Sequence, residues 1–191
     1  MLRRLVLIAL AMLGATGAQA QTPPPRVTLQ TTMGAIEITL DPVGAPLTSA
    51  HMLNLFKSGH YKGAAIFRIE PNFLIQLGDL DANLTYRPPP GKPVPLETAA
   101  NRHARGAVAL ARGDETSSGH SSFYFDLADN HHLNADPKAA PNTTGFAVFG
   151  RVTKGMEVLD AIASVERDPE RGPFRGKLPK TPIVVTTLMI E

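Results

Sequence analysis

Two short apolar runs joined by a turn constrain the fold of this 191-residue chain more than any other feature. The runs are Ala64–Ile69 and Phe73–Leu77, both rich in Ile and Phe, and Glu70-Pro71-Asn72 separates them. Proline fixes φ and asparagine tolerates unusual φ, so both residues favour a turn. Two runs of this composition around such a turn predict a β-hairpin.

One charged residue, Arg68, lies inside the first apolar run. If the connecting loop has three residues, Arg68 faces Gln76 directly across the hairpin. An unpaired charge is costly to bury, so a guanidinium beside a core needs a reason. The alternative is an edge-strand arginine whose stem packs while its head group stays in water. Residue type alone favours that alternative.

The first twenty residues have the pattern of a secretory signal peptide. Arg3 and Arg4 precede an apolar run from Leu5 to Leu13, and Ala18-Gln19-Ala20 is an A-x-A cleavage site. The apolar run is too short for a stable bilayer-spanning helix, so we expect no membrane anchor. We predict export and cleavage after Ala20, into the periplasm if the source is a Gram-negative bacterium and into the medium otherwise.

Removing residues 1–20 changes the charge balance. The full chain has 19 basic and 17 acidic residues, and the leader holds two arginines and no acid, so the mature chain is formally neutral. This balance indicates neither a nucleic-acid nor an anionic-membrane partner. The remaining length suits one domain with its own core. The sequence contains no cysteine, which excludes disulfides and thiol chemistry.

The rest of the chain is patterned mainly as short strands. Besides the hairpin, we expect strands at Arg26–Thr32, Ala35–Leu40, Gly106–Arg112, Ser122–Leu127, Phe146–Val152 and Ile183–Ile190. Helices are expected at Pro46–Lys57 and Met156–Ala163. Met33-Gly34 predicts a tight turn between the first two strands. A chain of this kind is typical of a closed β-barrel capped by helices.

The segments without periodicity are expected to be loops. Residues 21–25 predict a disordered leader, and Asp81–Leu96 and Asp168–Pro182 predict long loops. The Pro-rich loop at Asp81–Leu96 is not a domain linker, because neither flank is long enough to bury a core alone.

The hairpin resembles the signature of cyclophilin-type peptidyl-prolyl isomerases, F-H-R-x-x-P-x-F-M-x-Q-G-G-D. The stretch Ile66–Asp79 keeps the Arg, the Pro, the second Phe, the Gln and the final Gly-Asp in register. It departs at Ile66-Phe67, in place of Phe-His, and at Leu77, in place of Gly. The likeness continues through Asn101–Arg112, Ser121–Phe125, Asp129–Leu133 and Phe146–Val158, so it spans the chain from about Val27.

The resemblance implies a mainly β, closed antiparallel eight-stranded barrel, capped by two helices and covering residues 26–191. It also implies a monomeric isomerase of X-Pro bonds that needs no cofactor or metal and assists the folding of exported, proline-containing polypeptides. Arg68 and Gln76 would be the catalytic residues. The substrate-binding positions would be Phe73, Leu74, Leu110, Ala111, Arg112, Ser122, Tyr124, His132, Leu133 and Phe146.

The chemistry of the reaction explains why an arginine suits it. Rotation about an X-Pro bond faces a barrier of roughly 20 kcal/mol because of amide resonance. As the bond twists, the prolyl nitrogen loses conjugation and becomes a better hydrogen-bond acceptor. A donor aimed at that nitrogen binds the twisted state better than the planar one, which is the condition for catalysis. Arginine is always charged and carries five such donors.

Four departures from the family pattern fall in the expected site. Ser122 replaces a Gln, Tyr124 replaces a Phe, and Phe146 replaces a His or Tyr. His132 stands where a large aromatic, often Trp in eukaryotic members, is usual, which implies weak binding of cyclosporin. These changes keep a second hypothesis open, in which the chain is a cyclophilin-like module or chaperone that binds proline-containing peptides with little or no turnover.

Other functions have little support in the sequence. The six histidines show no H-E-x-x-H or similar spacing, so we expect no metal site. His131-His132 is interpreted as a solvated turn. Residues Ser118–Ser121 place serines beside a histidine but lack the strand–turn–helix context of a serine hydrolase.

Overall fold

The computed structural model describes residues 23–98 and 102–191. The predicted signal peptide and the first two residues of the predicted leader lie outside these ranges. Residues 23–25 form no helix or strand, but Pro25 is already tied to the sheet, because its carbonyl accepts a hydrogen bond from Leu40 N at 2.9 Å. No helix in the described ranges is both long and apolar enough to cross a bilayer.

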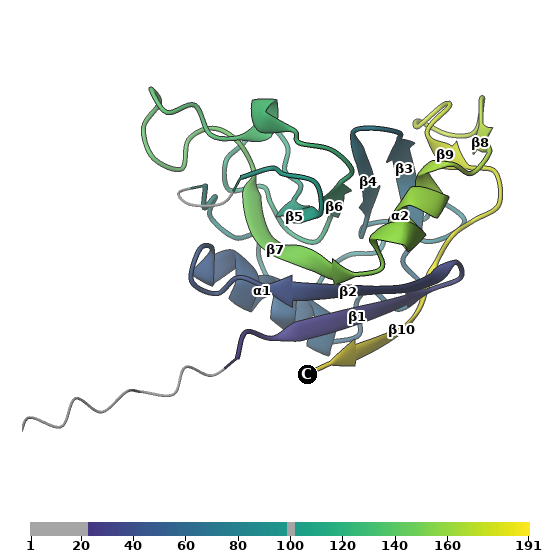
Figure 1. Ribbon diagram of the computed structural model, residues 1–191, viewed down its shortest axis with the longest axis horizontal. Coiled ribbons are helices and arrows are strands. Elements are labelled where there is room, and N and C mark those ends of the chain that lie inside the picture. The colour runs from purple at the N-terminus through teal and green to yellow at the C-terminus, as the bar shows by residue number, and fades with distance from the viewer. Residues whose placement is uncertain (1–22, 99–101) are drawn as a thin grey trace, which may run out of the picture.

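Eight antiparallel strands form one sheet in the order β10-β1-β2-β7-β5-β6-β4-β3 (Figure 1). The first four along the chain are β1 (Arg26–Thr31), β2 (Gly34–Leu40), β3 (Ile66–Glu70) and β4 (Leu74–Leu77). The others are β5 (Ala107–Leu110), β6 (Phe123–Asp126), β7 (Ala147–Lys154) and β10 (Val185–Ile190). Each lies within about two residues of its expected bounds.

The sheet is a strongly curled half-barrel rather than the closed barrel that we expected. Its edge strands, β10 and β3, do not pair with each other as strands. Segments beside them meet at a single bridge between Ala65 and Val184, where Ile66 N donates to Ile183 O at 2.9 Å. The edges of the sheet are therefore joined by a short backbone contact and not by a full ladder.

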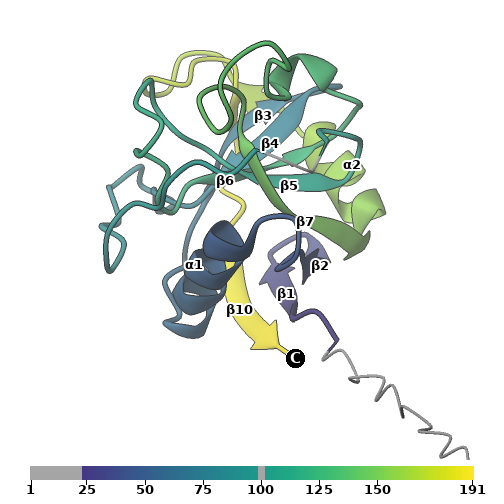
Figure 2. The same cartoon turned by 90° about the vertical axis from the view of Figure 1, so that its left-hand side faces the viewer.

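The two helices have the predicted bounds. Helix α1 (Pro46–Lys57) packs against β7 and β10, and α2 (Met156–Ala163) packs against β2 and β3. Figure 2 shows α1 beside β10. Proline stands in the first turn of α1, where its missing N–H is harmless. The buried apolar residues of α1 are Met52, Leu55 and Phe56, and those of α2 are Leu159 and Ile162.

Helix α1 is capped by a residue from a distant loop. Its N-cap residue, Ala45, offers no side-chain acceptor. Instead, the Glu97 carboxylate accepts hydrogen bonds from Leu47 N at 3.0 Å and Thr48 N at 2.6 Å. A carboxylate at this end satisfies free backbone N–H groups and interacts favourably with the helix dipole. The end of the Pro-rich loop is thereby attached to the helix.

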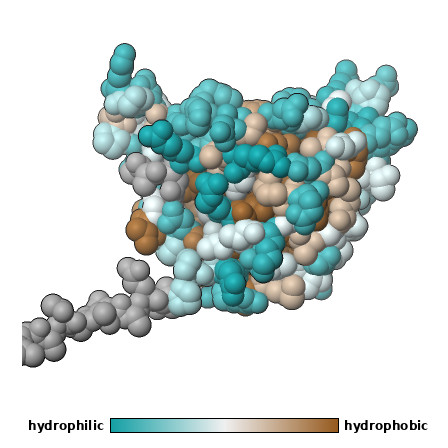
Figure 3. Space-filling view, in the orientation of Figure 1, coloured by the Kyte–Doolittle hydropathy of each residue, from teal (hydrophilic) through white to brown (hydrophobic). Residues whose placement is uncertain are grey.

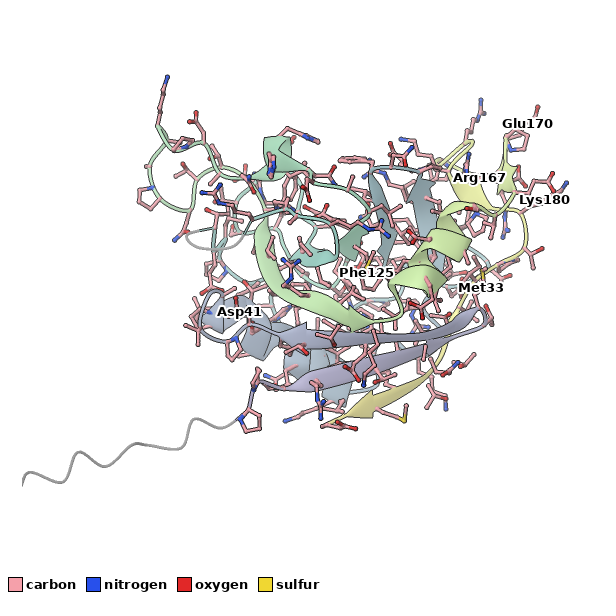
Figure 4. All side chains as sticks on the ribbon, in the orientation of Figure 1. Met33, Asp41, Phe125, Arg167, Glu170 and Lys180 are labelled. Carbon is pink, nitrogen blue, oxygen red and sulfur yellow. The ribbon has the colours of Figure 1, made fainter. Side chains whose placement is uncertain are left out.

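Aromatic side chains fill the inside of the curled sheet. Phe123 on β6 meets four rings edge-on, at centroid distances of 5.2 to 6.0 Å: those of Phe56, Tyr61, Phe125 and Phe149. Edge-to-face contacts of this kind are the arrangement that aromatic rings favour. All five side chains are almost fully buried, and Figure 4 shows Phe125 in the interior. Because side chains fill this interior, we expect functional groups on the outer face of the sheet or at its edges.

The turn between β1 and β2 lies one residue earlier than predicted. Thr32 and Met33 form the turn, and Gly34 already pairs with Thr31 (Figure 4). Gly34 adopts a φ of +139°, and a Cβ there would lie 2.8 Å from Val158 Cγ2. The glycine is therefore required by its backbone conformation and by the approach of α2.

Two short elements were not expected. Strands β8 (Arg167–Asp168) and β9 (Leu178–Pro179) pair in the segment that we interpreted as loop. They form a two-stranded sheet, with two residues in each strand, and β9 packs on β3. The predicted turn at His131-His132 is a 3₁₀ helix, η1 (His131–Leu133), whose two histidines are exposed as expected.

Candidate active site

The β3–β4 hairpin brings the two central polar side chains together. Its loop has three residues, 71–73, and Arg68 pairs with Gln76, which confirms the predicted alignment. Asn72 in this loop has a φ of +60°, the left-handed conformation that asparagine tolerates. The hairpin therefore places Arg68 and Gln76 side by side on one face.

The head group of Arg68 is bound by the protein rather than free in water. Nε donates to Glu70 Oε1 at 2.6 Å, and Nη1 donates to Gln76 Oε1 at 3.2 Å. The guanidinium carbon lies 5.8 Å from the centre of the Phe73 ring, within cation–π range. The side chain is 28% exposed. Arg68 is thus an edge-strand arginine, as the alternative interpretation expected. Its head group, however, is bound by Glu70 and Gln76.

Ser122 contacts this pair despite its short side chain. Gln76 Nε2 donates to Ser122 Oγ at 3.1 Å, and Ser122 Oγ donates to Leu77 O at 3.3 Å. Gln76 and Ser122 also line a cavity of about 400 Å³, together with Ala111 and Arg112. Ser122 is shorter than the glutamine of the family pattern, but it still orients Gln76. Open space remains beside the two side chains.

An apolar cluster covers the outer face of the sheet next to Arg68. It has a buried floor of Leu74, Ala107, Ala109, Tyr124 and Val148, and a half-buried rim of Phe73, Ala111, Leu133 and Phe146. Six of the expected substrate-binding residues belong to it. A seventh, His132, stacks on the Phe73 ring at 5.4 Å. Residues far apart in the sequence thus form one surface at the side of the guanidinium.

Leu110, which we expected to bind substrate, does not belong to this surface. Alternation along β5 directs Ala107 and Ala109 outwards and Val108 and Leu110 inwards. Leu110 accordingly packs in the interior core and is 4% exposed. The outer face of β5 presents only alanines, whose small side chains leave room above the sheet there.

The side chain of Arg112 supports the far rim of the cluster. Its Nε donates to Gly145 O at 3.0 Å, and Nη1 donates to Gly113 O at 2.8 Å. The guanidinium carbon lies 5.0 Å from the centre of the Phe146 ring. Nothing in the sequence indicated this contact between the Arg112 side chain and Phe146.

Sequence reasoning missed a buried polar network beneath the cluster. His103 Nδ1 lies 2.8 Å from Asp126 Oδ2, and both side chains are fully buried. Asn130 Nδ2 donates to Asp126 Oδ1 at 2.7 Å and to Phe73 O at 2.9 Å. The His103 ring lies 5.9 Å from that of Tyr124, nearly parallel to it. The only sequence signal was an aspartate at the end of an aromatic strand.

Two residues near the cluster have shifted pKa values: that of Tyr124 is raised and that of Glu70 is lowered. Burial raises the pKa of Tyr124 well above its usual value, and the nearby Asp126 carboxylate raises it further. The Tyr124 hydroxyl makes no hydrogen bond with the described residues. Partial burial would raise the pKa of Glu70, but hydrogen bonds from Lys177 and Arg68 outweigh it and hold that pKa below its usual value. At neutral pH, Tyr124 is therefore uncharged and Glu70 is ionised.

Metal-binding geometry is not found in the part of the chain that the structure describes. No group of three or more His, Asp or Glu side chains there is placed to hold an ion.

Comparison with known proteins identifies the family. The model of the family described as "Cyclophilin type peptidyl-prolyl cis-trans isomerase/CLD" matches residues 26–187. A peptidyl-prolyl cis-trans isomerase of Acinetobacter baylyi is 32% identical over 194 residues, covering 100% of this chain and 97% of that protein. The chain belongs to the cyclophilin-type peptidyl-prolyl cis-trans isomerases.

Other cyclophilins agree in sequence and in fold. An isomerase of Streptomyces antibioticus is 34% identical over 167 residues, covering 86% of this chain and 97% of that protein. A cyclophilin of Cryptosporidium parvum superposes with a TM-score of 0.70 at 19% identity, covering 88% and 98% of the two chains. A cyclophilin of Hirschia baltica superposes with a TM-score of 0.68, also at 19% identity, covering 88% and 74%. The TM-scores show that both structures have the same overall fold as this chain.

The buried pair beneath the cluster makes a prediction about stability. Asp126→Ala leaves the buried Nδ1 of His103 without its acceptor, and a buried donor left unsatisfied costs about 1–3 kcal/mol. We expect a loss of that size in the free energy of unfolding, measured by urea denaturation. The matched control, Glu191→Ala, removes only the exposed pair with Arg26 and should cost less than about 1 kcal/mol. Equal losses in the two variants would contradict the account.

Proposed function

We propose that this cyclophilin catalyses the rotation of X-Pro bonds through Arg68, with the prolyl ring held on the neighbouring apolar cluster. One observation carries the proposal: a fixed guanidinium lies at the side of that surface with donors still available. Within the described residues, Nε and Nη2 contact Glu70 and Nη1 contacts Gln76. These contacts use three of the five N–H bonds of arginine and leave two for a substrate.

The apolar cluster offers the kind of surface that a proline ring requires. Phe73, Leu133 and Phe146 form its rim, and Leu74 and Tyr124 form its floor. Figure 3 shows hydrophilic residues along the upper edge of one face of the molecule and apolar residues towards its centre. A prolyl ring bound there stays fixed while the preceding residue turns. A Cryptosporidium parvum cyclophilin has been solved in the presence of the dipeptide Ala-Pro, which supports a proline-containing substrate.

The polar residues around the cluster then have separate roles. Gln76 orients Arg68, and Ser122 orients Gln76. The backbone of Ala111 and Arg112, beside the 400 Å³ cavity, holds the substrate chain. Arg68 donates to the prolyl nitrogen as the bond twists. Each preference of about 1.4 kcal/mol for the twisted state accelerates rotation about tenfold.

We further propose that the protein acts as an exported monomer on folding polypeptides outside the cytoplasm. The support is the order of charged, apolar and A-x-A regions in residues 1–20.

The alternative function is a proline-peptide binding module with little turnover. The observation that favours it is the close contact of Glu70 with Arg68, because a carboxylate beside a cation weakens the field that the cation presents to a substrate.

Substitutions of Arg68 distinguish the two functions. Arg68→Ala should lower kcat/KM by orders of magnitude, and Arg68→Lys should also be poor because an ammonium lacks the planar fork that binds two partners. A protease-coupled assay on an Ala-Pro peptide measures both. Phe73→Ala should instead mainly weaken peptide binding, with some loss of stability. A wild type that only matches the uncatalysed rate, with Arg68→Ala changing affinity alone, would favour the binding module.

Export is tested separately. Expression in a Gram-negative host should yield a periplasmic protein whose first residue, found by mass spectrometry, is Gln21. The reason is that signal peptidase cuts after the A-x-A site. A membrane-bound product with its N-terminus intact would contradict this prediction.

A further inference from the structure

Glu70 makes the shortest contacts of the Arg68 head group. The two residues lie two positions apart on β3, so their side chains leave the strand on the same face. Glu70 Oε1 lies 2.6 Å from Arg68 Nε and 2.5 Å from Arg68 Nη2. Hydrogen bonds between charged groups are shorter and about twice as strong as neutral ones. The contact of Arg68 with Gln76, at 3.2 Å, is both longer and made to a neutral acceptor.

The same carboxylate is held from its other side by Lys177. Lys177 Nζ lies 2.9 Å from Glu70 Oε1. Lys177 belongs to the loop between β8 and β9, and its carbonyl accepts a hydrogen bond from Ile69 N at 2.8 Å. Phe174 in this loop packs on Phe67, with ring centres 5.0 Å apart. The loop is therefore attached to β3 on both sides of Arg68.

We propose that Glu70, held by Lys177, is a positioning residue that fixes the orientation of the Arg68 guanidinium for catalysis. This inference rests on the proposed catalytic role of Arg68. Glu70 occupies the Nε side of the guanidinium, so the remaining N–H bonds on Nη1 and Nη2 can face the substrate. A side chain that is oriented before the reaction begins does not have to be ordered during it.

The charges around Arg68 agree with a positioning role. A carboxylate alone beside Arg68 would cancel much of the positive field that the reaction needs. Lys177 adds a second positive charge, so Arg68, Glu70 and Lys177 together keep a net charge of +1. Glu70 also contacts Arg68 directly. Ser122 does not, because its hydroxyl is hydrogen-bonded to Gln76. The family signature leaves position 70 unspecified.

Four variants separate positioning from general stability. Glu70→Ile replaces the carboxylate by an apolar side chain that favours strands, and so removes the contact with Arg68. Glu70→Gln keeps the shape of the side chain but loses its charge. Lys177→Met removes the second support. The control, Lys180→Met, removes an exposed salt bridge to Glu166 in the same segment (Figure 4). For each protein, kcat and KM on an Ala-Pro peptide, the ¹H–¹⁵N signal of Arg68 Nε and the urea midpoint are measured.

The expected losses lie in kcat and not in KM. Glu70→Ile should lower kcat about tenfold, which corresponds to about 1.4 kcal/mol, and should leave KM within about twofold. Its Arg68 Nε–H signal should move towards the position of a solvent-exposed arginine. Glu70→Gln and Lys177→Met should show smaller losses in the same direction. Lys180→Met should match the wild type in all four measurements.

Two results would overturn the inference. One is a folded Glu70→Gln or Glu70→Ile with the kcat of the wild type, and the other is a loss confined to KM. If Arg68→Ala abolishes activity while these variants retain it, the inference fails and the catalytic role of Arg68 stands. If Arg68→Ala retains full activity, both fail.

Discussion

A guanidinium fixed beside an apolar surface is the interaction on which the site depends. Arg68 lies on β3, an edge strand, where a charged head group can reach the outer face without being buried. Glu70 and Gln76 accept hydrogen bonds from the guanidinium, and the Phe73 ring lies within cation–π range of it. An arginine free in water would first have to be ordered by the substrate. Here the protein has ordered it already.

The surface beside Arg68 follows from how the sheet is packed. Phe123 and the four aromatic rings around it fill the interior. Because side chains alternate along a strand, every second residue points outwards. On β5 the outward residues are alanines, which leave room above a floor that includes Tyr124. Beneath that floor, the His103–Asp126 pair and Asn130 connect β6 to the Phe73 carbonyl. The polar network thus fixes the rim from below while Arg112 supports it from the side.

The sequence predicted those features that depend on neighbouring residues. The register of Arg68 with Gln76 and the bounds of α1 and α2 are confirmed, because turns, caps and periodicity are local signals. Leu110 was placed wrongly because the expectation followed the family pattern and not the alternation along β5. The β8–β9 pair was missed because two-residue strands show no periodicity. The roles of Glu70 and Asp126 were not predicted, because they depend on contacts with Lys177 and His103, which are distant in the sequence. A single sequence gives no signal for such pairs.

The central claim is that this site turns prolyl bonds and does not merely bind them. Two-dimensional NMR exchange spectroscopy of an Ala-Pro peptide with a small amount of wild-type protein tests it most directly. Uncatalysed isomerisation takes tens of seconds, so the account predicts cis–trans cross-peaks at mixing times of about one second. It also predicts shifts in the Phe73 and Arg68 signals of the protein. Those same shifts without the cross-peaks would show a peptide bound at the site but not turned over, and would contradict the claim.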